Sequence, residues 1–514
     1  MNAKKLIQLA AASAAIFTIL LLCFINTLNS RIDFSKDKVF TLSPFSHQLL
    51  SDVSEKVQIT YYVSDKLSSF YPETRDVKDF LIEYCSHNKL ISLDVQDPQK
   101  AGLEQQLLSL GVEAQQIQTA SATETSLTSV YSAIVMEYRN KTEIIPFVVS
   151  TAGLEFELSS RLQFMTDNVS REVQILIGND FTLQDDYGYL VPWLQSAGFV
   201  CTQVFPAELN LLDPKVPLLV LGSKNLKAEN IFEIENFIMQ GGNAAFFASR
   251  SNVNIYTDWV AELDENSALT DLLDFWGISI QKELAVDIVN YRIEMQTGKQ
   301  NGTASEYINY PFWIVTGNHS LCSNSILNYG YSGLETYWAN PIELFEEEGR
   351  KLTPVLKTSI KASTMKEPFD TDPFRTRTRV FDNTRQLNLA ATLEGKVHGY
   401  YTTATSPDIR LFVLADQYAP SRMIEYTNSP HNMDFVVSVL LWLSNEDELL
   451  KIKNKGIRTT ALDSIVNLEG ASYAISRAVW LCFVLPLVIV ILTGVCFAIF
   501  RKKSRAEIKK GTEK

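Results

Sequence analysis

Residues 173–180, VQILIGND, decide the fold, because this almost wholly apolar run ends abruptly in glycine and polar residues. Residues 216–223, VPLLVLGS, repeat the pattern, and residues 243–249, NAAFFAS, add a third apolar run. Continuous apolar runs are typical of strands that are buried on both faces, as in parallel sheets covered by helices. The three runs therefore predict strands of one parallel sheet.

The segments between these strands have helical character. Residues 189–199 end in a glycine stop, and residues 227–242 place four apolar side chains at helical spacing before two glycines. Within residues 254–385, LTDLLDFWGISI predicts a helix followed by a strand. Two other segments, YRIEMQTGKQNGTASEYINYPF and EPFDTDPFRTRTRVFDN, are polar, turn-rich and weakly periodic, which indicates long loops or hairpins. Residues 409–421 again have a regular pattern and predict a strand that runs into a loop. The helix predicted after this loop is expected to pack on the same sheet. The sequence therefore predicts an α/β fold, with a parallel-sheet domain over residues 169–450 that carries long loop insertions.

The residues before this domain show a different sequence pattern. Residues 56–64 are rich in strand-forming side chains in alternation, and residues 75–86 place apolar side chains at helical spacing. Strands and helices continue in the order βαβαββ, and the last two strands meet at Asn140 and Lys141 before a closing helix. This order predicts a thioredoxin-like domain over residues 57–168. No redox cysteine pair follows the first strand, so the domain is expected to carry no redox chemistry.

Both ends of the chain carry an apolar segment of membrane-spanning length. Residues 6–28 and 478–500 are almost free of charge, and at ~1.5 Å per residue each is long enough to cross a hydrocarbon layer of ~30 Å. A cleaved signal peptide is the alternative for the first segment, but INTLNSR follows it in place of a small-residue cleavage site. Lysines precede the first segment and RKKSR follows the second, so both termini are expected to be cytoplasmic. Everything between the two segments is then expected to lie outside.

This external part carries the acidic charge. The whole chain has a net charge of −13, and the excess of positive charge at its two ends (+2 in residues 1–28, +5 in residues 501–514) leaves −20 for the rest. Nucleic acid and anionic lipid are therefore poor partners for it. The predicted parts are a cytoplasmic N-terminus (1–5), a transmembrane helix (6–28), a membrane-proximal arm (29–56), the thioredoxin-like domain (57–168), the α/β domain (169–450), a stalk (451–477), a second transmembrane helix (478–500) and a basic cytoplasmic tail (501–514).

The sequence lacks the motifs of nucleotide hydrolysis, acyl transfer and metal binding. It contains no GxxxxGK[ST], GxSxG, HExxH or EF-hand loop, and its five histidines are scattered. Outside the apolar segments lie Cys85, Cys201 and Cys322, an odd and widely spaced set with no CxxC pair and no zinc pattern. We expect no enzyme activity, no cofactor and no metal. A hydrolase or amidotransferase-like enzyme on the α/β domain is the less favoured alternative.

Two loops that follow predicted strands offer acidic side chains. Ligand crevices in open parallel sheets lie outside the carboxyl ends of the strands. Asp180, Asp185 and Asp186 in GNDFTLQDDYGYL, and Asp416 in LADQYAPS, are therefore candidates for contact with a ligand or cation. The alternative for each loop is a solvated connection that caps the next helix. Neither loop places a nucleophile beside a base.

Residues 30–50, SRIDFSKDKVFTLSPFSHQLL, begin where the first apolar segment stops. In an extended chain Arg31 and Asp33 share one side and Ile32 and Phe34 the other. Ser43 followed by proline is typical of a helix N-terminus and predicts a short helix over residues 44–51. The residues leave two interpretations open, a plain stalk or an arm that docks on another membrane protein.

This stretch resembles the opening signature, N-R-x-D-L-T-x-x-K-x-Y-T-L-S, of the gliding-motility GldG-like auxiliary components of ABC transporters. Further segments agree in order, namely RDVKDFLIEYCS, LDVQDP, YSAIVMEYRNKTEIIPF, LEFELSSRL, ENFIMQGGNAAFFAS and NMDFVVSVLLWLSNEDELLKIKNKGI. The resemblance covers most of residues 28–458. Ser30, Phe34, Ser35 and Phe40 depart from the signature by mostly conservative changes.

The resemblance implies a bacterial inner-membrane protein with a periplasmic ectodomain, anchored beside an ABC permease and a separate cytoplasmic ATPase. Its ectodomain is expected to bind substrate or a partner without reacting. The residues expected to dock on a partner are Arg31, Asp33, Lys38, Thr41, Leu42 and Ser43. The alternative from another class is a structural cell-envelope protein that recognises glycan or a motility partner.

Overall fold

The structure is a computed structural model that describes residues 41–120, 125–167, 171–256, 259–299, 302–316, 325–328, 334–376, 382–427, 430–457 and 480. Residues 36–458 form one compact body. Within the described part, no helix combines the length and apolar character needed to cross a bilayer. Apart from Trp480, the predicted membrane-spanning segments lie outside the described residues.

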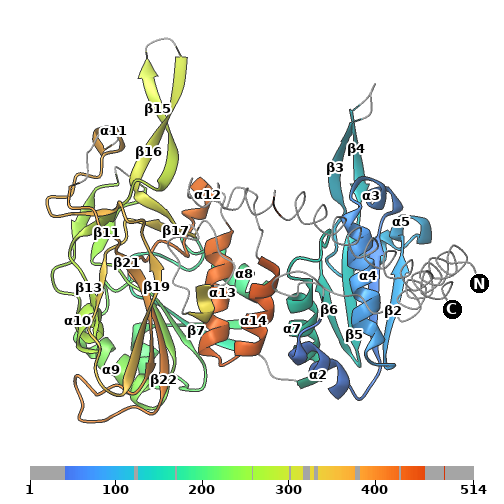
Figure 1. Ribbon diagram of the computed structural model, residues 1–514, viewed down its shortest axis with the longest axis horizontal. Helices are drawn as coiled ribbons and strands as arrows, with labels where there is room; N and C mark the ends of the chain where they lie inside the picture. Colours follow the sequence, from blue (N-terminus) through green and yellow to red (C-terminus); the bar gives the residue numbers. More distant parts are fainter. Residues whose placement is uncertain are drawn as a thin grey trace, which may run out of the picture. The chain divides into compact units, whose positions relative to one another are not determined.

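The first half of the body contains a four-stranded sheet in the order β2-β1-β5-β6 (Figure 1). β1 pairs parallel with β2, and β5 pairs antiparallel with both β1 and β6. The predicted order of strands and helices is present, but the hairpin β3–β4 was not predicted. The likeness to a thioredoxin-like fold stays a prediction. The strands are β1 (Val57–Val63), β2 (Ile91–Gln96), β3 (Gln115–Ala120), β4 (Thr125–Val130), β5 (Ser132–Tyr138) and β6 (Lys141–Ile145).

Two long helices pack on this sheet. The predicted apolar face of α4 is confirmed, because its four apolar side chains at helical spacing are buried and share a hydrophobic cluster with α7 and with β1. These side chains are Val77, Phe80, Leu81 and Tyr84. The helices of this half are α2 (Pro44–Asp52), α3 (Asp65–Phe70), α4 (Glu73–Ser86), α5 (Pro98–Ala101), α6 (Glu104–Ser109) and α7 (Leu154–Asp167).

Helix α2 begins where the sequence predicts. The hydroxyl of Ser43 accepts a hydrogen bond from the backbone N–H of Ser46 at 3.1 Å, and Pro44 occupies the first turn. Leu42, Leu50 and Val53 are buried in the same cluster as α4 and α7. Residues 42–53 of the predicted arm therefore belong to the packed body.

The second half is built on a nine-stranded sheet in the order β13-β18-β21-β22-β10-β9-β7-β8, with β19 also paired to β21. The five strands from β8 to β22 are mutually parallel. Side chains of β9 alternate between two hydrophobic clusters, since Leu218 and Val220 belong to one and Leu219 and Leu221 to the other. The parallel strands are β7 (Arg171–Ile177), β8 (Phe199–Val204), β9 (Leu218–Leu221), β10 (Ala244–Phe247) and β22 (Ile409–Leu414).

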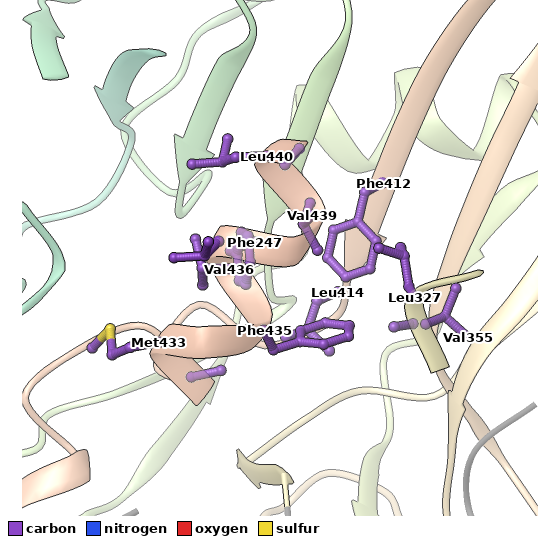
Figure 2. Close-up of a cluster of buried hydrophobic side chains, with 14 of the residues drawn as sticks. Phe247, Leu327, Val355, Phe412, Leu414, Met433, Phe435, Val436, Val439 and Leu440 are labelled. Carbon is purple, nitrogen blue, oxygen red and sulfur yellow. The ribbon is translucent and has the colours of Figure 1, made fainter. Parts of the chain in front are cut away.

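Helices cover both faces of the parallel strands. Helix α13 packs on one face, where Phe435 contacts Phe412 of β22 with 5.7 Å between ring centroids and Val436 and Val439 lie beside it (Figure 2). α9 and α10 pack on the opposite face, and the four apolar residues predicted to face inward from α9 are buried there: Ile231, Ile234, Phe237 and Ile238. The helices of this half are α8 (Leu190–Ser196), η1 (Pro206–Leu211), α9 (Ala228–Met239), α10 (Ala268–Phe275), η2 (Ile326–Asn328), α11 (Pro373–Thr376), α12 (Ile424–Thr427), α13 (His431–Leu443) and α14 (Asp447–Ile457).

Residues 254–385 supply much of the remaining β structure. The helix and the strand predicted in LTDLLDFWGISI are present as α10 and β13, and YRIEMQTGKQNGTASEYINYPF, predicted as a loop or hairpin, lies in the hairpin β15–β16. The sheet continues past β22 with antiparallel strands, and the hairpin β15–β16 projects beyond it (Figure 1). A hydrophobic cluster rich in tryptophan and tyrosine lies under this hairpin. The strands are β11 (Ser251–Val253), β12 (Ala261–Leu263), β13 (Ile278–Ile280), β14 (Leu284–Val286), β15 (Asn290–Lys299), β16 (Gly302–Thr316), β17 (Leu334–Tyr337), β18 (Ile342–Leu344), β19 (Arg350–Lys357), β20 (Ser363–Met365) and β21 (Asn388–Gly395).

The first residues of the predicted stalk belong to helix α14. Ile452 is buried, the ammonium of Lys453 donates to the carbonyl of Asp434 at 3.0 Å, and the amide of Asn454 donates to the carbonyl of Ile326 at 2.8 Å. The prediction of a stalk is therefore wrong for residues 451–457. Their polar composition suggested a solvated segment, but Lys453 and Asn454 bond to backbone carbonyls of the body. Residues 458–477 lie outside the described part.

Candidate functional site

The order of the parallel strands creates a switch point between β7 and β9. From β7 the chain passes to β8 on one side, and it later returns to β9, β10 and β22 on the other side. The connections that leave β7 and β9 lead to α8 and α9 on opposite faces of the sheet, and ligand crevices in such sheets lie outside the carboxyl ends of the strands at this point. A cleft of about 520 Å³ lies there. Its lining residues are Asn179, Asp180, Phe181, Asp186, Lys224, Asn252, Val253, Asn254, Tyr256, Val260, Glu262, Gln417 and Tyr418.

Two glycines allow the loops after β7 and β9 to come close together. Gly222 has φ +81°, and a Cβ on it would stand 2.7 Å from the Cβ of Asn179. A Cβ on Gly178 would stand 2.5 Å from the carbonyl oxygen of Gly222. Neither approach is compatible with a larger residue, so the two glycines position Asn179 and Asp180 at the cleft.

An amide network joins the loops that leave three of the strands. The Asn179 side chain donates to the Gln417 amide oxygen at 2.9 Å, and Gln417 donates to the Asn252 amide oxygen at 3.0 Å. These residues follow β7, β22 and β10, so the network fixes one wall of the cleft. The hydroxyl of Tyr187 adds to it by donating to the carbonyl of Gln417 at 3.1 Å.

Asp180 is one of the predicted ligand residues that do line the cleft. Its carboxylate accepts from the ammonium of Lys224 at 2.8 Å and from the amide of Asn225 at 2.9 Å. These two donors hold the pKa of Asp180 below its usual value. The carboxylate is exposed and remains ionised at neutral pH.

Asp185 and Asp186 have separate roles. Asp186 lines the cleft but is buried, and its carboxylate accepts from the backbone N–H of Thr182 at 2.7 Å and from the hydroxyl of Tyr256. Asp185 is exposed, lies outside the lining and exchanges hydrogen bonds with Thr182 within the same turn. The loop therefore closes on itself, and Asp186 holds the hydroxyl of Tyr256 at the cleft.

Asp416 does not line the cleft. Its carboxylate is fully buried and accepts from the backbone N–H groups of Tyr337 and Tyr418, each at 2.7 Å. Burial raises its pKa to about 7. Asp416 therefore joins the end of β22 to β17, and its neighbours Gln417 and Tyr418 are the residues that face the cleft.

The residues predicted to dock on a partner are only partly described. Arg31, Asp33 and Lys38 lie outside the described residues. Among those described, Leu42 is buried, the carbonyl of Thr41 accepts from the ammonium of Lys455, and the backbone N–H of Ser43 donates to Glu155 at 2.6 Å. Thr41, Leu42 and Ser43 thus contact α7 and α14 of the same chain.

Sequence reasoning missed most of the cleft. The residues it did not select include Lys224, Asn252, Tyr256, Glu262 and Gln417. One signal was present, because LGSK after β9 repeats the pattern of an apolar strand followed by glycine and polar residues that singled out IGND after β7. The other residues of this set lie on segments that are brought together only by the order of the strands in the sheet, which the local sequence does not show.

The cleft lining consists of groups that can form hydrogen bonds and aromatic contacts with a ligand. The described residues contain no group of three or more histidine, cysteine, aspartate or glutamate side chains that would hold a metal ion. Cys201 lies on β8 outside the lining, and burial raises the pKa of its thiol to about 11. The cleft presents amides, carboxylates, one ammonium and aromatic rings.

Comparison with known proteins gives three matches. A family described as "ABC-type uncharacterized transport system" matches residues 165–439, which is more than half of the chain and includes the whole lining of the cleft. A domain of unknown function (DUF7088) matches residues 36–137. An uncharacterized protein of Borreliella burgdorferi is 23% identical over 502 residues, covering 94% of this chain and 96% of the relative.

Proposed function

Since the chain belongs to the ABC-type uncharacterized transport system family, we propose that it is a membrane-anchored, extracytoplasmic auxiliary subunit of an ABC transporter. It would act with a separate permease and a separate ATPase, and its body would bind a substrate or a partner. The observation that carries the proposal is the family match over residues 165–439, because this range contains the strands, the switch point and the cleft.

The sequence supports the assignment of nucleotide hydrolysis to a separate chain. Nucleotide hydrolysis by an ABC system needs a P-loop, and this sequence contains no GxxxxGK[ST]. The ATPase of the system is therefore expected to be another chain. The likeness to gliding-motility GldG-like components is a finer part of the proposal and rests on the ordered motifs in residues 28–458.

The membrane anchor is also part of the proposal. Residues 6–28 and 478–500 supply two apolar segments with basic flanks on the terminal sides. Anchoring by both would hold the acidic body against the outer face of the inner membrane, next to a permease. In this arrangement the cleft at β7 and β9 is the site where the body meets its ligand.

Affinity purification tests this proposal. A tag on the C-terminus of the full chain, extracted from membranes in mild detergent, is expected to copurify one ABC ATPase and one permease at comparable amounts, as measured by quantitative mass spectrometry. An unrelated membrane protein with the same tag and similar abundance is the control. Enrichment of neither protein over that control would overturn the proposal. Retention of envelope glycan after deletion of the permease would favour a structural envelope protein instead.

A further inference from the structure

The cleft contains several polar groups without a partner. Asn252 uses its amide oxygen to accept from Gln417, and Asn254 uses its amide oxygen to accept from the backbone N–H of Tyr256, both at 3.0 Å. Among the described residues, neither amide nitrogen has an acceptor, and Glu262 has neither a hydrogen bond nor an ion pair. The cleft therefore offers both hydrogen-bond donors and acceptors to a ligand.

The cleft is poorly suited to an anion. Asp180, Asp186 and Glu262 place three carboxylates in its lining, against the single ammonium of Lys224. That ammonium is already paired with Asp180 at 2.8 Å. A phosphate or carboxylate ligand would meet repulsion without an unpaired positive charge to offset it.

A cationic ligand is also a poor match, although the lining is acidic. The carboxylates of Asp180 and Asp186 each accept hydrogen bonds on both oxygens, from Lys224 and Asn225 in one case and from Thr182 and Tyr256 in the other. Glu262 is the carboxylate of the lining that has no hydrogen bond among the described residues, and the ammonium of Lys224 would repel a cation placed beside it. The lining is therefore better suited to a ligand whose neutral groups form hydrogen bonds with it.

An aromatic ring adds an apolar contact to these polar groups. Tyr256 is 60% exposed although its hydroxyl bonds to the buried Asp186 and the guanidinium of Arg422 lies 5.8 Å from its ring centroid. The ring is thus held in a fixed position while much of it faces solvent. A fixed aromatic ring binds an apolar ligand face at a low cost in conformational entropy.

We propose that the ligand of this cleft is a neutral saccharide of about two sugar units. Vicinal hydroxyl groups donate and accept at adjacent positions, which matches the amide nitrogens of Asn252 and Asn254, the carboxylate of Glu262 and the ammonium of Lys224. The C–H face of a sugar ring is apolar and fits the ring of Tyr256. The volume of about 520 Å³ lies within the range of ~300–1,000 Å³ that small-molecule pockets occupy. This inference rests on the proposed function in taking the cleft as the ligand site.

Saturation-transfer NMR on the full chain, held in a detergent without sugar groups, tests the proposal. The probes are maltose, cellobiose, trehalose and N,N′-diacetylchitobiose, with spermidine and glucose 6-phosphate as charged comparisons. We expect transfer to at least one neutral disaccharide and a weaker signal for the charged probes. Tyr256→Ala and Asn252→Ala are each expected to weaken that binding by about tenfold.

Tyr307→Ala is the matched control. Tyr307 is 59% exposed, has the guanidinium of Arg292 at 5.9 Å from its ring centroid, and lies on β16 outside the cleft lining. Its replacement is expected to leave disaccharide binding unchanged. Saturation transfer to none of the four disaccharides, preference for a charged probe, or equal loss in Tyr256→Ala and Tyr307→Ala would each overturn the inference.

The outcome is separable from that of the purification experiment. A chain that copurifies a permease and an ATPase but binds no disaccharide would contradict the ligand class and leave the transporter role standing. A chain that binds a disaccharide through Tyr256 but copurifies neither protein would contradict the transporter role alone.

Discussion

Replacing Glu235 with alanine is expected to lower the free energy of unfolding by about 4 kcal/mol or more. Glu235 lies on α9 and is fully buried. Its carboxylate accepts from the backbone N–H groups of Tyr400, Tyr401 and Thr402 at 2.9–3.1 Å, and from the hydroxyl of Thr402 at 3.0 Å. It therefore satisfies three consecutive backbone donors of a loop distant in sequence.

The cost of this change follows from the donors that it leaves behind. Hydrogen bonds to a charged acceptor contribute roughly 1.5–3 kcal/mol each. The three N–H groups share the buried carboxylate of Glu235, although the side chains of Tyr400 and Tyr401 are exposed. The loop is tightly turned at this point, because a Cβ on Gly399 would stand 2.2 Å from the hydroxyl oxygen of Thr402. Glu235→Gln keeps one acceptor oxygen and is expected to show an intermediate loss.

Urea unfolding of the purified chain measures this effect, and hydrogen exchange at residues 400–402 shows whether it is local. Glu233→Ala is the matched control, since Glu233 lies on the same helix, is partly exposed and accepts one bond from Asn236 at 3.4 Å. We expect the control to change stability by less than about 0.5 kcal/mol. Equal stability of Glu235→Ala and Glu233→Ala would contradict the role assigned to Glu235.

Asp416→Ala is expected to destabilise the protein by about 3 kcal/mol or more at pH 5, and by less at pH 8. The change removes the acceptor of the backbone N–H groups of Tyr337 and Tyr418 at every pH. The pH dependence has a separate origin, because burial raises the pKa of Asp416 from an ordinary 3.8 to about 7.

The raised pKa of Asp416 determines how its contribution to the free energy of unfolding changes with pH. Between pH 4 and pH 7 the folded protein keeps a proton on Asp416 that the unfolded chain has lost. The stabilisation is therefore complete below pH 4 and is lost as the pH rises through 7, at about 1.4 kcal/mol per pH unit. Glu335 has a pKa raised by burial as well and contributes in the same direction in both proteins.

The measurement is the difference in unfolding free energy between wild type and Asp416→Ala from pH 4 to pH 8. This difference is expected to shrink as the pH rises. Asp185→Ala is the control, and because Asp185 is exposed, this change should alter the unfolding free energy by less than about 0.5 kcal/mol. A constant difference for Asp416→Ala would show that its carboxyl titrates in the folded protein as it does in the unfolded chain.

Asp416 also shows where sequence reasoning stops. Its position after an apolar strand is the same as that of Asp180, so the local sequence does not distinguish a buried acceptor of backbone N–H groups from a residue that lines a cleft. The difference arises from β17, whose N–H of Tyr337 reaches Asp416 over 79 positions of sequence. A contact between residues so far apart in the sequence leaves no periodic pattern in the sequence around either residue.

The parts that were predictable are those with a strong local pattern. The inward face of α4 and of α9, the start of α2 at Ser43 and the two strands around Asn140 follow from spacing or from capping residues, and the structure has each of them. The antiparallel extension of the large sheet was not predictable in the same way. The sequence predicts the strand β13 but not its pairing with β18, and β18 and β19 are short or polar with partners that lie far away in sequence.

The candidate site also has a part that the sequence predicts and a part that it does not. The sequence indicates that ligands meet the carboxyl ends of the strands, and the cleft is there. Its identity as a binding site depends on Lys224, Asn252, Tyr256 and Glu262, which four different loops and strands contribute. Their meeting is a consequence of strand order, with β7 between β8 and β9.

The location of the body relative to the membrane is the claim on which the proposed function depends most. It is tested by labelling with a membrane-impermeant maleimide in spheroplasts, using a chain whose six cysteines are replaced by serine. Leu211→Cys reports on the body, since Leu211 is 75% exposed, and Lys510→Cys reports on the basic tail. We predict full labelling at position 211 before lysis and labelling at position 510 only after lysis. Protection of position 211 until lysis would contradict an extracytoplasmic body and with it the proposed role beside a permease.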